Sequence, residues 1–267
     1  MLRIAVAGAA GRMGGRISAL AGEFEGLSLT GAFERAGHGA IGKDVGEAAG
    51  AGRLGVTLTE GVGSVLNSAD IIIDFTAPEA TLANMEAAAA AGKAMVIGTT
   101  GIDKAGQERI KELSAKVPCV YAGNMSLGIN LLMKVVGDIA RALGTDYDVE
   151  VFEAHHKMKK DAPSGTALML AGAAADALGL SLDSDGVFER HGMIGERKKG
   201  EIGVQTIRGG DVVGEHTVMF LGMGERVEVS HRVSNRDTFA RGALRAALWL
   251  KGKGPGLYNM QDVLGLR

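Results

Sequence analysis

Short apolar runs alternate with longer helix-like segments through the first half of the chain, and this alternation constrains the fold most. The run ADIIIDFT contains three consecutive isoleucines, which need apolar cover on both faces, as in a parallel sheet. Strand–helix alternation at this spacing predicts βαβ units and a doubly wound sheet. The expected strands are 3–8, 27–34, 69–76, 94–101 and 118–124, and the expected helices are 13–24, 78–92 and 104–116.

The second half has a different pattern. An amphipathic helix is expected over 129–143, a strand over 147–156, a helix over about 164–178 and a closing helix over 238–252. Between the last two helices, 200–234 contains three strand candidates with Gly-rich turns, which indicate an antiparallel or mixed sheet. The predicted fold class is α/β: a Rossmann-like doubly wound parallel sheet, then an α+β domain with a mixed sheet. We expect a dinucleotide-binding domain over 1–125 and a second domain over 126–237, and leave open whether 238–267 returns to the first.

Composition excludes several classes of protein. With 267 residues, 46% of them hydrophobic, and a net charge of −2, the chain has enough apolar residues for a core and no basic field for nucleic acid. Its one cysteine, Cys119, excludes an intramolecular disulfide and a multi-cysteine zinc site, and we interpret it as a buried strand residue. No apolar run approaches the roughly 20 residues of a membrane helix, and the N-terminus lacks a signal-peptide layout. We therefore expect a soluble cytoplasmic protein without a membrane or nucleic-acid partner.

The first strand runs into a glycine motif, VAGAAGRMGGR. Gly8 permits a tight turn, Gly11 permits close approach of a pyrophosphate, and Gly14 permits close packing of the helix that follows. Glu34 ends the second strand, where an acidic side chain grips the adenosine ribose, and Arg35 beside it suits a 2′-phosphate. NADH and NADPH therefore both remain open. The alternatives are a plain Gly-rich turn and ordinary surface charges.

Two further loops follow expected strands. GTTG (98–101) and AGNMS (122–126) lie at carboxyl ends of strands, which line the ligand crevice of an open parallel sheet. Their small and hydroxyl-bearing residues suit a nicotinamide ribose or ring. As an alternative, both are turns, with Ser126 capping the next helix.

The stretch EAHHKMKKDAPSGTAL (153–168) concentrates titratable and cationic side chains before a helix start. Histidine donates protons near neutral pH, and lysines supply positive charge. Asp161 or Ser164 is the candidate cap, so Gly165 and Thr166 would present a hydroxyl and N–H groups at a helix N-terminus, which suits a carboxylate. The alternative is a solvated basic loop before a capped helix.

We expect the adjacent His155 and His156 to have different roles, because neighbours on a strand point to opposite faces. Zinc is a poor alternative for this stretch: Glu153, His155 and Asp161 are candidate ligands, but no H-x-x-x-H motif or cysteine pair supports them. We expect no metal. The remaining histidines are interpreted as structural or surface residues: His38, His191, His216 and His231.

The motifs VAGAAGRMG, DFT, GTTG, AGNMSLGIN and above all EAHHKMKKDAPSGTAL resemble the 4-hydroxy-tetrahydrodipicolinate reductases, the dihydrodipicolinate reductase (DapB) family of the diaminopimelate route to lysine. The resemblance implies reduction of 4-hydroxy-tetrahydrodipicolinate, a cyclic dicarboxylate, by NADH or NADPH to give tetrahydrodipicolinate. It also implies a homotetramer built through the sheet of the second domain, which would bind the substrate. Two other functions remain open: reduction of another imine or an aldehyde on the same scaffold, and a non-catalytic NAD(P)-binding sensor.

The resemblance also implies roles for individual residues. His155 corresponds to the proton donor and acceptor, Lys159 to the proton donor, and His156 to a substrate contact. Gly165 and Thr166 correspond to the clamp on the substrate carboxylate. Lys157 and Lys160 are left open, as added positive charge or as surface residues. The implied cofactor contacts are Gly8, Ala9, Ala10, Gly11, Arg12, Met13, Glu34, Arg35, Gly98, Thr99, Thr100, Ala122, Gly123, Asn124 and Met125.

Overall fold

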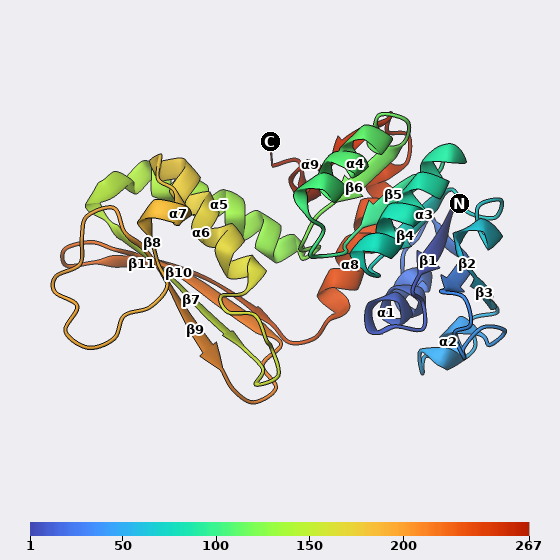
Figure 1. Cartoon of the computed structure of the whole chain (residues 1–267), viewed down its shortest axis with the longest axis horizontal. Helices are drawn as coiled ribbons and strands as arrows, with labels where there is room; N and C mark the ends of the chain where they lie inside the picture. Colours follow the sequence, from blue (N-terminus) through green and yellow to red (C-terminus); the bar gives the residue numbers. More distant parts are fainter. Residues whose placement is uncertain (267) are drawn as a thin grey trace. The chain divides into compact units, whose positions relative to one another are not determined.

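The computed structural model describes residues 1–266, which form two compact units (Figure 1). Unit 1 contains Met1–Leu127 and the residues from Arg236 onward, and unit 2 contains Gly128–Asn235. The sequence placed the corresponding boundaries after residues 125 and 237.

Unit 1 is built on a parallel sheet with the strand order β12-β6-β5-β4-β1-β2-β3. This confirms the predicted Rossmann-like, doubly wound arrangement. The isoleucine run is buried on both faces of the sheet: Ile71 and Ile73 enter one hydrophobic core and Ile72 enters the other. The strands are β1 (Leu2–Ala7), β2 (Leu27–Glu34), β3 (Leu58–Glu60), β4 (Ile71–Asp74), β5 (Ala94–Ile97), β6 (Pro118–Tyr121) and β12 (Gly256–Tyr258).

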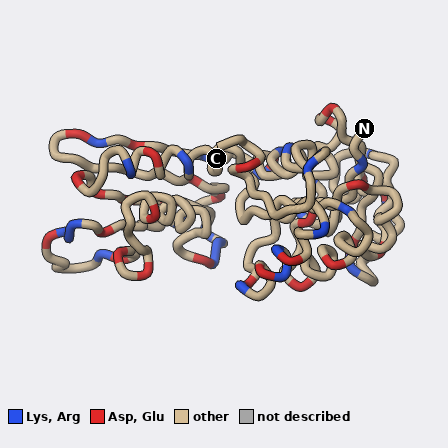
Figure 2. The backbone as a smooth tube through the Cα atoms, turned by 90° about the horizontal axis from the view of Figure 1, so that it is seen from above, with Lys and Arg blue, Asp and Glu red and all other residues tan. Residues whose placement is uncertain are grey.

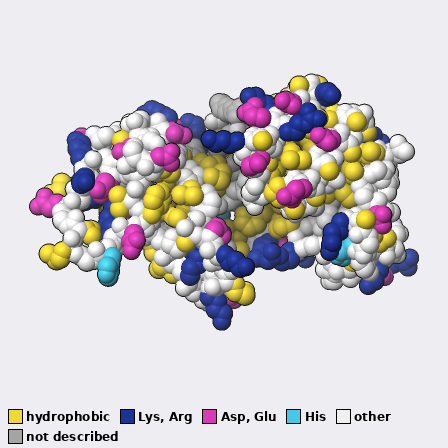
Figure 3. All heavy atoms as spheres, viewed as in Figure 1, with side chains coloured by type: hydrophobic (Ala, Val, Ile, Leu, Met, Phe, Trp, Pro, Cys, Tyr) yellow, Lys and Arg dark blue, Asp and Glu magenta, His cyan; other side chains and the backbone are white. Residues whose placement is uncertain are grey.

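Helices cover both faces of this sheet. One core lies beneath α1 (Arg12–Leu20), α8 (Asp237–Leu250) and α9 (Met260–Leu264), and the other beneath α3 (Pro78–Ala90) and α4 (Lys104–Ser114). The apolar side chains visible over α3 in Figure 3 include its exposed alanines, which are small. The remaining short elements are α2 (Val45–Ala48) and the 3₁₀ turns Ala21–Glu23 and Val62–Ser64.

Unit 2 has a mixed sheet with the order β11-β10-β7-β9-β8, as the predicted fold class requires. Strand β7 is parallel to β9 and antiparallel to β10, so it lies between two strands that follow one another in the sequence. Helices α5 (Leu127–Leu143) and α6 (Gly165–Leu178) pack on one face through a third core (Figure 1). The other elements are β7 (Asp148–His155), β8 (Gly186–Val187), β9 (Ile202–Arg208), β10 (Gly214–Leu221), β11 (Arg226–Val233), α7 (Leu182–Asp185) and the 3₁₀ turn Gly144–Asp146.

Charge is dispersed over both units. Basic and acidic positions are interspersed along the chain in Figure 2. Within residues 1–266, no helix combines the length and the apolar character needed to cross a membrane. Cys119 lies in β6 and is fully buried, which confirms its interpretation as a buried strand residue, and burial raises the pKa of its thiol.

Candidate active site

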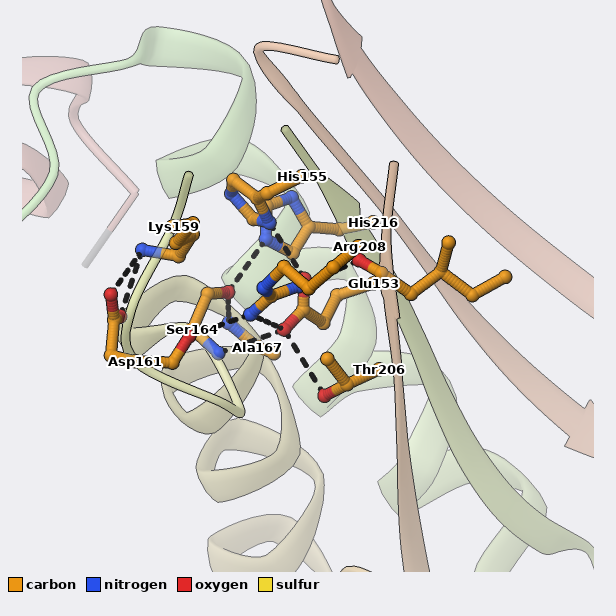
Figure 4. Close-up of polar contacts among 10 residues, drawn as sticks. Glu153, His155, Lys159, Asp161, Ser164, Ala167, Thr206, Arg208 and His216 are labelled. Carbon is orange, nitrogen blue, oxygen red and sulfur yellow. Dashed lines mark hydrogen bonds and ion pairs between the residues drawn. The ribbon is translucent and has the colours of Figure 1, made fainter. Parts of the chain in front are cut away.

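The stretch 153–168 lies at the end of β7, where three neighbouring strands bring their side chains together. In the parallel pairing, His155 is opposite Arg208 of β9 and Glu153 is opposite Thr206. In the antiparallel pairing, Glu153 is opposite His216 of β10. Figure 4 shows the side chains that converge there.

The Glu153 carboxylate is the centre of this cluster and is fully buried. Arg208 donates one hydrogen bond of 2.8 Å to each carboxylate oxygen. Oε1 also accepts from the Ser164 N–H at 3.0 Å and from the Thr206 hydroxyl at 3.2 Å. Burial alone would raise the pKa of Glu153, but the hydrogen bonds from Arg208, His155 and Ser164 outweigh it and lower the pKa to about 2. Glu153 is therefore a stable anion at neutral pH.

His155 is 9% exposed and contacts Glu153 directly. Its Nδ1 lies 2.6 Å from Oε2 of Glu153, and its ring meets the ring of His216 edge-on, with centroids 5.2 Å apart. Burial lowers the pKa of His155, and this outweighs the opposing effect of Glu153. The imidazole is therefore neutral at neutral pH and can accept a proton.

His216 is 4% exposed, and its Nε2 lies 3.1 Å from the Ser164 hydroxyl. Burial, together with the nearby His155, lowers its pKa to about 4. The sequence assigned His216 to the structural or surface residues, and the structure places it inside the cluster, in contact with His155.

The loop after β7 carries the lysines. The Lys159 ammonium forms an ion pair with Asp161 at 2.8 Å, and this side chain is 21% exposed. The hydrogen bond from Lys159 lowers the pKa of the Asp161 carboxyl. Lys157 and Lys160 are both exposed.

His156 follows β7 and is half-buried. Its Nδ1 is buried and has no hydrogen-bond partner among residues 1–266. A buried polar atom without a partner costs free energy, which a ligand that pairs it would recover. This geometry suits the predicted role of His156 as a ligand contact.

Helix α6 begins beside the cluster. Ser164 is its N-cap, and the Ser164 hydroxyl accepts a hydrogen bond of 3.1 Å from the Ala167 N–H. The capping prediction is thereby confirmed for Ser164 rather than Asp161. Gly165 and Thr166 form the first two positions of the helix, where the helix dipole favours an anion.

Three members of the cluster were not identified as site residues from the sequence. They are Thr206, Arg208 and His216, and Glu153 was considered only as a zinc ligand. Arg208 lies 55 positions from Glu153 in the sequence, so only the pairing of β7 with β9 brings them together. Across residues 1–266 no group of three or more His, Cys, Asp or Glu side chains is arranged to hold a metal ion.

In unit 1 the glycine motif forms the turn between β1 and α1. Gly8 has φ +59°, in the left-handed region, and a Cβ added at Gly14 would lie 2.3 Å from the Gly8 carbonyl oxygen. Gly11 is the N-cap of α1, and no side chain caps this helix end. The turn therefore leaves the start of α1 open to an anion, as a dinucleotide site requires.

Glu34 ends β2 and faces this turn. It is 8% exposed, and its Oε1 accepts a hydrogen bond of 3.0 Å from the Ala10 N–H. The Ala9 N–H donates to the Phe33 carbonyl, so the backbone N–H groups of Ala9 and Ala10 are both engaged within the protein. Arg35, next to Glu34, is exposed.

The loop after β5 is held by a buried polar cluster. Asp74, fully buried at the end of β4, accepts from the side chains of Thr76 and Asn84 at 2.6 and 2.8 Å. The Thr81 hydroxyl joins Asp74 to the Thr99 hydroxyl, which lies 2.7 Å away. The Thr99 side chain is thus engaged in the interior, whereas Thr100 is exposed.

The loop after β6 contains the last group of predicted cofactor contacts. Gly123 is exposed, whereas Asn124 and Met125 are buried, and the Asn124 side chain accepts a hydrogen bond of 2.8 Å from the Ser126 N–H. Ala122 donates its N–H to the Ile97 carbonyl. The predicted cofactor contacts follow β1, β2, β5 and β6, so they share the carboxyl edge of one parallel sheet.

Comparison with known proteins identifies the family of the chain. The family Dihydrodipicolinate reductase, N-terminus, matches residues 2–125, and Dihydrodipicolinate reductase, C-terminus, matches residues 128–264. The chain belongs to the dihydrodipicolinate reductase family. The resemblance inferred from the motifs is thereby confirmed.

Curated members of this family match over their full length. The 4-hydroxy-tetrahydrodipicolinate reductase of Syntrophobacter fumaroxidans (strain DSM 10017 / MPOB) is 54% identical over 267 residues, with 100% of both chains covered. The reductase of the same name from Geotalea uraniireducens (strain Rf4) is 52% identical, again over 100% of both chains.

Solved structures share the fold. The dipicolinate-bound dihydrodipicolinate reductase from Paenisporosarcina sp. TG-14 has a TM-score of 0.78 at 22% identity, and 98% of each chain is covered. An amine dehydrogenase from Mycobacterium smegmatis has a TM-score of 0.61 at 13% identity, covering 97% of this chain and 95% of that one. Dihydrodipicolinate reductases thus share their fold with other dehydrogenases, so activity must be argued from the site.

Proposed function

We propose that the chain catalyses the NAD(P)H-dependent reduction of 4-hydroxy-tetrahydrodipicolinate to tetrahydrodipicolinate, in the diaminopimelate route to lysine, with the 4-hydroxyl group leaving as water. The observation that carries the proposal is the cluster in unit 2, where Glu153 contacts both His155 and the N-cap residue of α6, Ser164, and where His156 and Lys159 follow on the loop after β7. This arrangement combines groups that exchange protons with groups that attract carboxylates. Membership of the reductase family supports the same assignment.

Unit 1 provides the groups that suit a pyridine dinucleotide. The uncapped start of α1 fits the pyrophosphate, and Glu34 at the end of β2 fits the adenosine ribose. The loops after β5 and β6 lie at the same edge of the sheet and fit the nicotinamide half. The dinucleotide supplies a hydride when bound.

The choice between NADH and NADPH depends on two neighbouring side chains. The Glu34 carboxylate favours the unmodified ribose, and the exposed Arg35 guanidinium suits a 2′-phosphate. We infer that the enzyme accepts both, and that Arg35→Ala raises the KM for NADPH more than the KM for NADH. Equal changes in the two constants would contradict this role for Arg35.

In unit 2, the substrate carboxylates bind to cationic and N–H groups, and a proton is delivered after hydride transfer. Gly165 and Thr166 at the start of α6 hold one carboxylate, and His156 contacts the substrate through its unpaired Nδ1. Lys159, an ammonium with three N–H donors, gives the proton. His155 lies in the same cluster and exchanges protons with the substrate.

The test is an assay of NADH and NADPH oxidation with freshly generated 4-hydroxy-tetrahydrodipicolinate, alongside a panel of other cyclic imines and aldehydes. We expect turnover with the dicarboxylate to exceed turnover with every other compound. Faster turnover of another imine or an aldehyde would instead assign a different reductase. Binding of NADH without oxidation in any assay would favour a non-catalytic sensor.

We further propose that the enzyme is a cytoplasmic homotetramer assembled through the open face of the unit 2 sheet. Along β10, buried residues alternate with half-buried ones, which include Met219 and Leu221. Light scattering coupled to size-exclusion chromatography measures the mass directly, and a monomeric mass would contradict the assembly. Cell fractionation tests the compartment.

A further inference from the structure

The carboxylate of Glu153 joins the two strands and the helix that surround His155. Its five hydrogen bonds come from Arg208, Thr206, Ser164 and His155, and together they fix both oxygens in place (Figure 4). Because Arg208 binds both oxygens, the carboxylate is held in one plane and keeps its charge. A buried carboxylate with this many hydrogen bonds has a fixed position and orients the side chains that contact it.

The Glu153 carboxylate orients the ring of His155. Oε2 of Glu153 is an anionic acceptor 2.6 Å from Nδ1, so Nδ1 must carry the ring proton. The neutral ring is then the Nδ1–H tautomer, and the lone pair is on Nε2. A Cβ added at Gly214 would lie 3.1 Å from Nε2, so the absence of a side chain there leaves room beside this nitrogen.

We propose that Glu153, held by Arg208, is a positioning residue for the reduction: it selects the Nδ1–H tautomer of His155 and presents Nε2 as the nitrogen that exchanges protons with the substrate. The proposal rests on the proposed function, because it assigns a task to His155 within that reaction. Glu153 itself is buried beneath His155 and acts through it.

The two oxygens of Glu153 differ in a way that makes the proposal testable. Oε1 accepts hydrogen bonds from three donors, Ser164, Thr206 and Arg208, whereas Oε2 accepts from two, Arg208 and His155. In Glu153→Gln, the amide oxygen is expected to take the Oε1 position, since the amide NH₂ there would face three donors. The NH₂ group then faces Nδ1 of His155, which must become an acceptor. The substitution therefore inverts the tautomer of His155 without changing the size of the side chain.

The first measurement determines the tautomer in the wild-type protein. Solid-state ¹⁵N NMR of the full-length protein, labelled at the histidine rings, distinguishes protonated from unprotonated ring nitrogens, and His155→Asn assigns the His155 signals among the 6 histidines. At a pH where the ring is neutral, we expect Nδ1 protonated and Nε2 unprotonated. An Nε2–H tautomer in the wild-type protein would overturn the proposal.

The second measurement compares three variants. Glu153→Gln is expected to invert the signals and to lower kcat by about 10²- to 10³-fold, the scale of a lost general acid or base, with an unchanged Kd for NADH. Glu153→Asp keeps the charge and should retain the Nδ1–H tautomer and recover part of the activity. Glu150→Gln is the matched control and should leave kcat near that of wild type, because Glu150 lies on the same strand and is likewise an arginine-paired carboxylate, with Arg190 and Arg197 as its partners.

The pH profile adds a readout that a purely structural role would not move. The groups facing His155 are Glu153 on β7, Arg208 on β9, His216 on β10 and Lys159 on the loop. Of these, Glu153 alone raises the pKa of His155 through its charge, so Glu153→Gln should shift the acidic limb of kcat to lower pH.

The outcomes separate the two proposals. If the wild-type protein is active and Glu153→Gln has the same kcat and the same His155 tautomer, the positioning role is wrong and the proposed function stands. If the wild-type protein shows no turnover, the proposed function is wrong, while the ¹⁵N spectrum of the wild-type protein still reports the tautomer of His155. If Glu153→Gln does not fold, the wild-type spectrum and Glu153→Asp decide: full activity of Glu153→Asp with an inverted ring would contradict the proposal.

Discussion

Lys159 differs from its neighbouring lysines in having a fixed partner. Its ammonium is paired with Asp161 and its side chain is half-buried, whereas Lys157 and Lys160 are exposed. An ordered ammonium at a defined position can deliver a proton to one atom of a bound substrate. This difference makes Lys159 the lysine of the loop that best fits proton transfer.

Lys159→Ala is expected to lower kcat by about 10²- to 10⁴-fold, because the proton donor is lost, while the Kd for NADH stays the same. Steady-state kinetics and fluorescence titration with NADH measure the two quantities. Lys160→Ala removes an exposed charge from the same loop and serves as the control, with kcat expected near wild type. Wild-type turnover in Lys159→Ala would remove this lysine from the mechanism.

His216 is a second residue whose environment has a measurable effect. It is neutral in the folded protein, where its pKa is about 4, and it titrates at the ordinary histidine pKa of 6.5 when the chain is unfolded. Between these values the unfolded chain binds more protons, so stability falls as the pH decreases from about 6.5 toward 4. By pH 5 the loss amounts to about 2 kcal/mol, at about 1.4 kcal/mol per pKa unit.

The check is urea unfolding at pH 7.5 and pH 5 of the wild type and of His216→Asn. We expect the variant to be less stable at pH 7.5, because it loses buried contacts, but to lose about 2 kcal/mol less than wild type on acidification. Equal losses in the two proteins would mean that folding does not lower the pKa of His216.

At the scale of elements, the turn from β1 into α1 depends on the close approach of helix and strand. A Cβ at Gly14 would lie 2.8 Å from Cα of Ala9 and still closer to the Gly8 carbonyl oxygen. Both of these are backbone atoms, so the clash cannot be relieved by rotating a side chain. The helix itself would have to move away from the sheet.

Gly14→Ala is therefore expected to destabilise the protein by about 1–3 kcal/mol and to weaken NADH binding, because the start of α1 shifts. Gly22→Ala is the matched control, since a Cβ at Gly22 meets no atom within 4 Å. Thermal unfolding with and without NADH measures both effects. A Gly14→Ala protein with wild-type stability would show that the turn tolerates the displacement.

Most helices and strands could be predicted because the pattern of apolar and polar residues within each segment indicates which of its residues are buried. Strand β2 was expected over 27–34 and spans Leu27–Glu34, and helix α3 begins at Pro78, as its proline indicated. Strand β12, at Gly256–Tyr258, was missed because three residues carry no periodic pattern. It forms only by pairing with the edge strand β6, a contact between distant segments.

The site was predictable only in part, for the same physical reason. His155, Lys159 and the start of α6 lie within one continuous motif, so a single stretch of sequence contains them. Arg208 and His216 reach His155 through strand pairing, and no local spacing relates 155 to 208 or 216. The order β10-β7-β9, with β7 between two consecutive strands, was the missing information.

At the scale of the whole molecule, the two units divide the proposed tasks. The groups that suit a dinucleotide lie in unit 1, and the groups that suit a cyclic dicarboxylate lie in unit 2. Each ligand should therefore protect its own unit from solvent exchange.

Hydrogen–deuterium exchange with mass spectrometry tests this division. NADH alone is expected to slow exchange in peptides covering 8–15, 98–101 and 122–126, because their amides border the bound molecule. Pyridine-2,6-dicarboxylate alone is expected to slow exchange in peptides covering 155–170. Protection of 155–170 by NADH alone, with no change in 8–15, would contradict the assignment.

The path of the chain also affects how the molecule is made. Unit 2 is one continuous segment, whereas unit 1 is completed only by α8, whose Ala243, Leu244 and Ala247 enter the core that α1 shares. On the ribosome, the first 127 residues emerge long before this helix, and until it follows one face of their sheet is only partly covered, by α1. Unit 2 can fold during that interval, so the later-synthesised unit is expected to be finished first. Loss of the final segment would then leave a folded substrate domain attached to an incomplete partner, a species that a quality-control protease can recognise.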